Sequence, residues 1–206
     1  MWTQYWPIYE QLENELREIT FFISLEDVHL NVFSARFAEL LLRIGQECEN
    51  IGKTLATQLA LSPSSGTIQR LNFPSLGNLL CTNVALNAKV VEVIWVYQSL
   101  STSKKLLTPF STWSSSGSVN PVWYDTYNGL KHDRNTHFSR ANYGNVIEAL
   151  AGLFILNLWL RKDDIERDSE WIVLARKRIT SYSELFDPSS FLQLGLGGTN
   201  KRLELV

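Results

Sequence analysis

One apolar seam constrains the fold of this chain more than any other sequence feature. Ser34 precedes the seam and is a good N-cap, because its hydroxyl oxygen accepts hydrogen bonds from free backbone N–H groups. The pattern predicts a long amphipathic helix over residues 34–60 that anchors the fold. Its apolar side chains recur at steps of three and four residues over roughly six turns, at Phe37, Leu40, Leu41, Ile44, Cys48, Ile51, Leu55 and Leu59.

A second central helix is predicted over residues 146–160, where nearly every side chain is apolar. The segment is shorter than the ~20 apolar residues that cross a bilayer, and it contains Glu148 and Asn157. Helices that are apolar almost all round are typical of the centre of a bundle. We therefore expect a core helix here, and no membrane partner.

The remaining predicted elements surround these two helices. Helical spacing favours helices over residues 7–19, 76–88 and 163–182, and β-branched and aromatic residues favour short strands over 28–33 and 90–97. The two strands are candidates to pair with each other. We expect a mainly α-helical bundle that forms a single domain over residues 1–190 and allows one small β-hairpin. Residues 191–206, which are rich in glycine, are expected to be a loosely held C-terminal tail.

Composition limits the partners and the compartment. The chain has 19 Lys and Arg against 21 Asp and Glu, so it lacks the broad positive field of nonspecific nucleic-acid binders and any RNA contact must be local. Cys48 and Cys81 have no CxxC spacing, which fits two reduced thiols. The first residues lack the basic start and apolar run of a signal peptide. These features predict a cytoplasmic protein.

Familiar catalytic and cofactor fingerprints are absent from the sequence. It contains no Walker A loop, no GxGxxG after a strand, no GxSxG elbow and no HExxH motif. Three histidines and two distant cysteines do not form a metal-ligand pattern. We therefore predict neither a cofactor nor a metal site.

The most distinctive polar segment is WYDTYNGLKHDR, residues 123–134. Asn120 and Pro121 before it resemble a helix start, with a capping side chain followed by a proline of fixed φ. One continuous helix would place five polar or aromatic groups within an arc of roughly 100°. These groups are Tyr124, Asn128, Lys131, His132 and Asn135.

The chemistry of this segment suits an anionic ligand. Lys131 and Arg134 supply positive charge, and the histidines His132 and His137 exchange protons near neutral pH. RNA cleavage needs activation of a 2′-hydroxyl and charge stabilisation at the phosphate, which a histidine and one or two cations provide without a metal. The candidate catalytic residues are therefore Lys131, His132 and His137, and the candidate ligand-binding residues are Asn128, Lys131, Arg134 and Asn135.

The same residues also fit a purely structural role. Asn128 and His132 are spaced to satisfy buried backbone groups from one side of a helix. Lys131 would then pair with an acidic residue of the long helix, such as Glu47 or Glu49. Residue types alone leave both interpretations open.

Five sequence blocks form a recognisable set: FSARF at 33–37, ECENIGK at 47–53, PF at 109–110, WYxxYNxxKHxR at 123–134 and ANxxNVIEAL at 141–150. Together they resemble a group of bacterial helical proteins akin to the HEPN superfamily, over roughly residues 33–160. The most specific part is the YNxxKHxR block. The resemblance implies a helical bundle, often dimeric, of toxin–antitoxin or phage-defence systems, in which many members are metal-independent RNases. Active members have an arginine a few residues before a histidine, and Lys131 before His137 is the nearest match to that pair. By this similarity Lys131, His132 and Arg134 lie at or near the functional helix.

Two functional hypotheses follow. The first is a cytosolic HEPN-like protein of a bacterial stress or phage-defence system that binds RNA or a nucleotide and is a candidate metal-independent RNase. The second is a noncatalytic helical interaction or dimerisation module, which pairs as a homodimer or with a protein partner encoded at the same locus.

Overall fold

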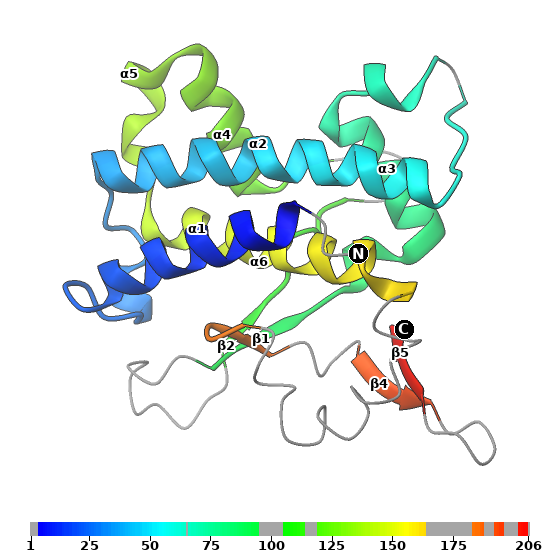
Figure 1. Ribbon diagram of the computed structural model, residues 1–206. Coiled ribbons are helices and arrows are strands. Elements are labelled where there is room, and N and C mark those ends of the chain that lie inside the picture. Colours follow the sequence, from blue (N-terminus) through cyan, green and yellow to red (C-terminus); the bar gives the residue numbers. More distant parts are fainter. Residues whose placement is uncertain are drawn as a thin grey trace.

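The computed structural model describes residues 4–64, 66–94, 105–113, 119–163, 183–187, 192–195 and 202–205. Within these ranges the protein is mainly helical, as the sequence predicts, and a small sheet lies against one side of the helices (Figure 1). The α-helices are α1 (Tyr5–Thr20), α2 (Ala35–Gln58), α3 (Phe73–Val84), α4 (Val122–His132), α5 (Arg134–His137) and α6 (Tyr143–Leu160). Short 3₁₀ helices lie at η1 (Asp27–His29), η2 (Ile68–Arg70), η3 (Leu86–Ala88) and η4 (Phe138–Arg140).

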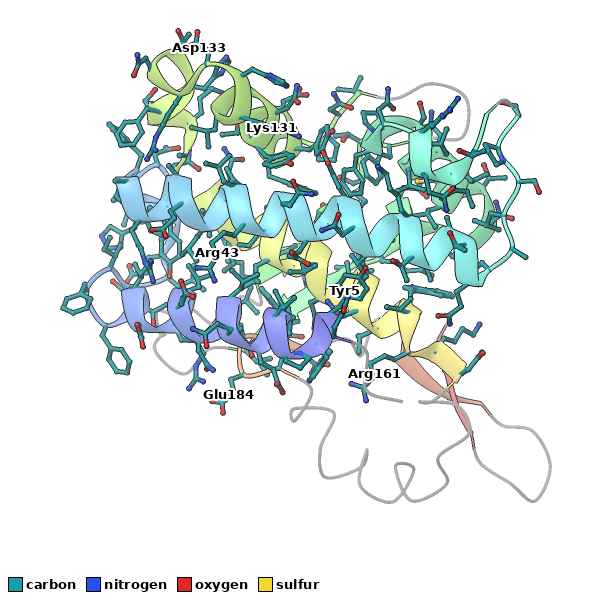
Figure 2. All side chains as sticks on the ribbon, turned by 45° about the horizontal axis from the view of Figure 1, so that its top comes forward. Tyr5, Arg43, Lys131, Asp133, Arg161 and Glu184 are labelled. Atoms are coloured by element: carbon teal, nitrogen blue, oxygen red, sulfur yellow. The ribbon has the colours of Figure 1, made fainter. Side chains whose placement is uncertain are left out.

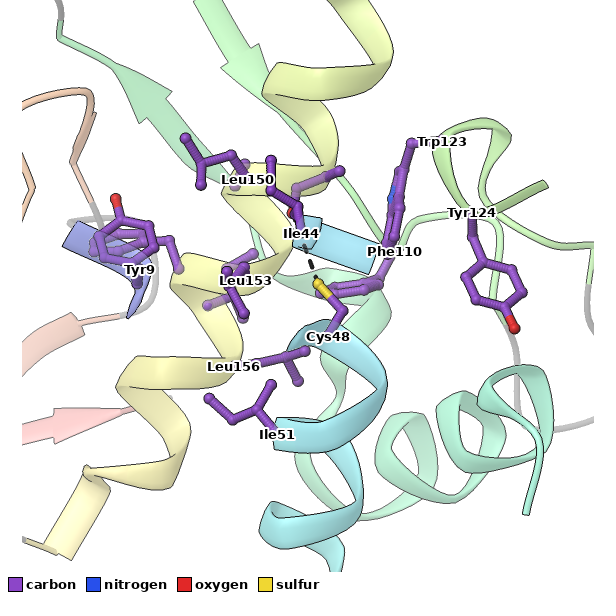
Figure 3. Close-up of a cluster of buried hydrophobic side chains, with 14 of the residues drawn as sticks. Tyr9, Ile44, Cys48, Ile51, Phe110, Trp123, Tyr124, Leu150, Leu153 and Leu156 are labelled. Atoms are coloured by element: carbon purple, nitrogen blue, oxygen red, sulfur yellow. Dashed lines mark hydrogen bonds between the residues drawn. The ribbon is translucent and has the colours of Figure 1, made fainter. Parts of the chain in front are cut away.

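Helices α2 and α6 form the centre of the fold, and both were predicted. The Ser34 hydroxyl accepts the Phe37 N–H at 3.1 Å, which confirms Ser34 as the N-cap of α2. Side chains of the α2 seam are buried against α6, and the Cys48 thiol donates to the Ala149 carbonyl oxygen at 3.9 Å (Figure 3). These two helices make the most extensive contact between any two described elements.

Helix α6 belongs to the core of the protein. It is the one described helix that is long and apolar enough to cross a membrane, but 83% of its 18-residue window is buried inside the fold. Helices α1, α2 and α4 pack against it. The structure therefore confirms the prediction of a core helix, which begins three residues earlier than expected because the Asn142 side chain caps it by accepting the Asn145 N–H at 3.0 Å.

The predicted strand at residues 28–33 is wrong. The chain turns there between α1 and α2, with η1 followed by a single bridge between Phe33 and Asn142. Local hydrogen bonds favour the turn over a strand: the His29 N–H donates to the Glu26 carbonyl oxygen at 3.0 Å, and the His29 ring nitrogen Nδ1 lies 2.9 Å from the Ser24 carbonyl oxygen. The predicted pairing of 28–33 with 90–97 is therefore wrong as well.

A three-stranded antiparallel sheet takes the place of the predicted hairpin. Its order is β2–β1–β3, where β1 is Val91–Val93, β2 is Lys105–Leu107 and β3 is Phe186–Asp187. Val93 aligns with Lys105 on one side and with Phe186 on the other. The strand predicted at 90–97 is thus confirmed over β1, and residues 95–97 lie outside the described ranges.

The C-terminal part of the chain is described only in places. Strands β4 (Leu192–Gly195) and β5 (Arg202–Leu205) pair antiparallel with each other within residues 191–206, and the prediction that this segment is a loosely held tail stays a prediction. The helix predicted over 163–182 lies almost wholly outside the described residues. The helix predicted over 76–88 is shifted: α3 begins at Phe73, because Asn72 caps it, and ends before Ala85, which adopts a left-handed backbone with φ 49°.

An aromatic cluster positions α4 against the core. The Phe110 and Trp113 rings stack at a centroid distance of 5.0 Å, and Phe73 meets Trp113 edge-on at 5.0 Å. The Trp123 Nε1–H donates to the Pro109 carbonyl oxygen at 2.8 Å. These contacts tie the start of α4 to the loop that follows β2 and to α3.

Candidate functional site

Helix α4 begins and ends differently from the sequence prediction. Pro121, not Asn120, is the N-cap, and the Asn120 side-chain amide donates instead to the Asp125 carboxylate at 2.7 Å. The helix ends at His132, because Asp133 adopts φ −146° and ψ 80° and caps α5, where its carboxylate accepts the Thr136 N–H at 3.3 Å. The prediction of one continuous helix through Asn135 is therefore wrong.

The inner face of α4 is held by tyrosines that pack on α2. The Tyr127 ring lies directly on Gly45, where an added Cβ would be 2.4 Å from the ring. The Tyr124 hydroxyl donates to the Glu49 carboxylate at 3.3 Å, and burial raises the pKa of both phenols. These contacts fix the rotation of α4 and thereby decide which of its residues face solvent.

Most of the predicted site residues lie on the exposed surface. Among the described residues, the exposed side chains of Asn128, His132, Arg134 and Asn135 make no hydrogen bond or ion pair. The structural role considered for Asn128 and His132, burial within the bundle, is therefore wrong. Lys131 is also exposed, and its Nζ lies 3.5 Å from the Tyr127 hydroxyl and 5.5 Å from the centre of that ring (Figure 2).

The structure does not bring Lys131 and His137 together. The His137 ring packs on Gly129, where an added Cβ would lie 2.5 Å from it. Lys131 follows Gly129 by two positions, which is about 200° around the helix, so it points away from His137. His132 follows Gly129 by three positions, about 60° from it on the other side, so the two histidines share one side of α4.

Lys131 instead faces a groove of about 400 Å³. Arg43 and Glu47 contribute its other charges, and burial raises the pKa of the Glu47 carboxyl. Lys131 makes no ion pair with Glu47 or Glu49 within the described structure, contrary to the pairing considered from sequence. The groove is lined by Ile8, Leu12, Leu42, Arg43, Gln46, Glu47, Tyr127 and Lys131.

The turn from α4 into α5 and η4 concentrates positive charge in ten residues. We call this region the basic corner; it comprises Lys131, His132, Arg134, His137 and Arg140. Its only carboxylate, Asp133, is engaged as the α5 cap, and hydrogen bonding with Thr136, followed by attraction to His137, holds the pKa of Asp133 below its ordinary value. The exposed cations of this corner remain accessible to an external anion.

An aromatic surface adjoins the basic corner. Phe33 is 48% exposed, and its ring meets Phe138 of η4 edge-on at a centroid distance of 5.8 Å. The Asn145 side-chain amide ties η4 to the core by donating to the Arg140 carbonyl oxygen at 2.8 Å and to the Thr126 hydroxyl at 3.2 Å. Asn145 of α6 thus anchors the basic corner to α4 and α6, while the charged groups of the corner are exposed to solvent.

One polar group with an unusual environment was missed as a site residue. Glu148 lies in the first half of α6 and lines two cavities, although sequence analysis treated it only as an interruption of an apolar helix. A lone carboxylate in an otherwise apolar helix was the available signal. Among the described residues, no group of three or more His, Cys, Asp or Glu side chains is arranged to hold a metal ion.

Comparison of the chain with protein-family models, curated proteins and solved structures gives no match. The resemblance to HEPN proteins therefore stays a prediction from the sequence blocks alone.

Proposed function

We propose that this protein is a HEPN-like protein that binds RNA or a nucleotide through the basic corner. The observation that carries the proposal is the accessibility of Lys131, Arg134 and Arg140, none of which pairs with a carboxylate among the described residues. Unpaired cations on a fixed scaffold bind phosphate groups by charge and hydrogen bonding. The sequence resemblance suggests a cytoplasmic role in a bacterial stress or phage-defence system.

The neighbouring aromatic surface favours single-stranded RNA over a bare phosphate. Proteins that bind single strands combine cations along the backbone with aromatic rings on which bases stack. Phe33 offers such a ring beside the corner, with half of its surface exposed and its edge fixed by Phe138. A nucleotide would use the same two kinds of contact on a smaller scale.

Fluorescence anisotropy with a labelled single-stranded RNA tests the binding proposal. We expect Lys131→Ala and Arg134→Ala to weaken binding, and each lost phosphate contact to reduce the slope of log K against log salt by about 0.7. Phe33→Ala should weaken binding by about 1–3 kcal/mol with the salt slope unchanged. AMP and inorganic phosphate as competitors separate nucleotide recognition from phosphate binding.

Arg70→Ala is the matched control, because Arg70 is an exposed cation in η2, away from the corner. The Arg70→Ala variant should bind the RNA with the affinity of the wild type and with the same slope of log K against log salt. The binding proposal is refuted if the corner variants bind RNA as the wild type does.

Metal-independent RNA cleavage is a second candidate activity at the same corner. The two histidines on one side of α4 favour it, because His137 is packed on Gly129 near the Asp133 carboxylate and His132 is exposed beside it. Such a pair provides a general base and a general acid without a metal. Lys131 lies on the other side of α4 from the two histidines, where it would contact a different phosphate of the RNA, so the charge at the cleaved phosphate would come from Arg134.

The cleavage assay uses labelled RNA with EDTA present. We expect wild-type cleavage to fall at least a hundredfold in His132→Ala and in His137→Ala, the usual size of a lost acid or base. Equal cleavage by the wild type and both variants would remove the catalytic roles. Binding without cleavage by the wild type would leave the protein as a noncatalytic RNA binder.

The alternative function, a noncatalytic interaction or dimerisation module, is supported by a different surface. Phe22 is 88% exposed and Val28 is 77% exposed in the turn between α1 and α2. Apolar side chains exposed to this degree are common at surfaces that bind a second copy or a partner protein. Light scattering across a range of protein concentrations, with Phe22→Ser for comparison, distinguishes the two functions: a dimer abolished by the variant, with no RNA binding, supports this alternative.

A further inference from the structure

Glu148 lies between two cavities on the side of α6 that faces β2 and the start of α4. The smaller cavity is about 180 Å³ and the larger about 360 Å³. Both are lined by Val122, Asn145 and Glu148, so this carboxyl group is placed where a ligand in either cavity would reach it. Both cavities lie beside Val122 at the start of α4, whereas Asn145 of their lining also donates to the Arg140 carbonyl oxygen of the basic corner. An inference about Glu148 does not depend on the function proposed for that corner.

One oxygen of the Glu148 carboxyl group has no partner among the described residues. This atom, Oε2, is shielded from solvent and accepts no hydrogen bond from them, whereas the Thr108 backbone donates to the carboxyl group. Burial raises the pKa of Glu148 to about 7, against the smaller opposing effects of Lys105 and Thr108. A buried acceptor without a donor is destabilising, so a donor group placed in either cavity would be stabilised by this oxygen.

Lys105 is the described cation that acts electrostatically on Glu148, and it is engaged elsewhere. Its Nζ lies 2.5 Å from the Asp27 carboxylate, and it contributes to the larger cavity alone. The larger cavity is therefore the less suitable of the two for a cationic ligand.

The smaller cavity has the composition of a cation site. Among the described residues its lining has no lysine or arginine, and Glu148 is the one ionisable group there. Trp123 is also a lining residue, and its indole N–H already donates to the Pro109 carbonyl oxygen, so Trp123 adds no free donor. Hydroxyl and amide oxygens provide further acceptors. The lining residues are Thr108, Pro109, Ser111, Thr112, Pro121, Val122, Trp123, Asn145 and Glu148.

We propose that the smaller cavity binds an ammonium or guanidinium group, with Glu148 as its counter-charge. A charge-assisted hydrogen bond from the ligand would satisfy Oε2. The ligand is either a free small amine or guanidine, or the side chain of a lysine or arginine in a peptide.

Binding is coupled to a proton. The cation favours ionised Glu148, so the protein releases the carboxyl proton to the buffer as the ligand enters. Near pH 7 the released amount is about half a proton, because the group is then about half protonated in the free protein. Affinity should fall roughly thirtyfold from pH 8.5 to pH 5.5, as the ionised fraction falls.

Titration calorimetry at pH 7 in two buffers of different ionisation enthalpy tests the site. The probes are methylguanidinium, which represents a free small ligand, and N-acetyl-arginine methylamide, which represents a peptide side chain. We expect binding of at least one probe with release of about half a proton. Binding of methylguanidinium alone supports a free ligand, and binding of the capped arginine supports a peptide.

Glu148→Gln keeps the shape of the side chain and removes its charge, so it should weaken binding at least tenfold and abolish proton release. Glu47→Gln is the matched control, because Glu47 is a half-buried carboxyl group of α2 in a different groove, and it should bind as the wild type does.

A measurement on the wild-type protein tests the site without relying on a variant that could fail to fold. Carbon-13 NMR of the glutamate carboxyls should show the pKa of Glu148 falling when the bound probe is present. The proposal is overturned if neither probe binds or lowers that pKa, or if Glu148→Gln binds a probe as tightly as the wild type.

Discussion

At the scale of single residues, two glycines of α2 show how closely α2 meets its neighbours. Gly45 lies under the Tyr127 ring, where an added Cβ would be 2.4–2.8 Å from three ring carbons. Gly52 lies near Leu76, where the shortest distance of 2.9 Å is to a terminal methyl group. A rigid ring close to its own backbone cannot move aside, whereas the end of a leucine side chain can.

We therefore expect Gly45→Ala to destabilise the protein by about 1–3 kcal/mol, as overpacking does. Gly52→Ala should change the free energy of unfolding by less than about 1 kcal/mol, because the helical preference of alanine offsets a small shift of Leu76. Urea unfolding of the two variants gives the comparison. Equal effects would mean that α4 moves away from α2 without cost.

Single residues also explain why the site was only partly predictable. The predicted arc of polar groups assumes an ideal helix, which Asp133 interrupts. Aspartate is a preferred N-cap residue, so Asp133 was a signal in the sequence for this break. The packing of His137 on Gly129 was not predictable, because it depends on how α5 folds back against α4.

At the scale of elements, Glu15 joins α1 to α2. Its Oε2 lies 2.7 Å from guanidinium nitrogens of both Arg36 and Arg43 (Figure 2 labels Arg43). The hydrogen bond from Arg43, with smaller contributions from other groups, lowers the pKa of Glu15. The folded state therefore favours ionised Glu15, and its stabilisation is present above pH 4.5 and is lost as the pH falls through the lowered pKa.

Glu15→Gln should accordingly destabilise the protein by about 1–3 kcal/mol at pH 7, the value of a hydrogen bond to a charged group. The loss should be smaller at pH 3, where wild-type Glu15 is becoming protonated. Glu39→Gln, which removes an exposed carboxylate that pairs with Arg36 alone, should cost less than about 1 kcal/mol at either pH. A pH-independent loss in Glu15→Gln would contradict this account.

Elements with strong helical periodicity were predicted well, and short apolar runs were not. The apolar seam of α2 identifies a helix because a spacing of three and four residues, repeated over many turns, fits a helix and not a strand. The apolar run of α6 identifies a helix because it is too long for a strand. The alternation at 28–33 covers only six residues, and local hydrogen bonds of Ser24, Glu26 and His29 outweigh it. Strand β3 has two residues and exists only because β1 lies beside it.

At the scale of the whole molecule, the sheet depends on segments that are distant in the sequence. Tyr9 and Glu13 of α1 reach the chain before β3, where the Glu13 carboxylate accepts the Leu185 N–H at 3.2 Å and also bonds to the Ser183 hydroxyl. Burial raises the pKa of Glu13. No local pattern in the sequence predicts such contacts, which explains why the sheet order and the environment of Glu148 were not predicted.

Buried carboxyl groups with raised pKa values set the response of the whole molecule to pH. The folded state holds the Glu148 proton up to about pH 7, whereas the ordinary value is 4.5, so it binds more protons than the unfolded chain between these values. Stability must fall as the pH rises through this window, by about 3 kcal/mol from Glu148. Glu13 and Glu47 act in the same direction. Because Glu15 acts oppositely below pH 4.5, we expect maximal stability near pH 5.

Urea unfolding of the wild type at pH 5 and pH 8 should therefore show greater stability at pH 5. In Glu148→Gln the difference between the two pH values should shrink by about 2.5 kcal/mol, because an amide does not titrate in this range. Glu39→Gln changes an exposed side chain, so it should leave the difference in stability between pH 5 and pH 8 as in the wild type. If Glu148→Gln retains the full wild-type difference in stability between pH 5 and pH 8, Glu148 is ionised at neutral pH. The neutral carboxyl group inferred between the two cavities then does not exist.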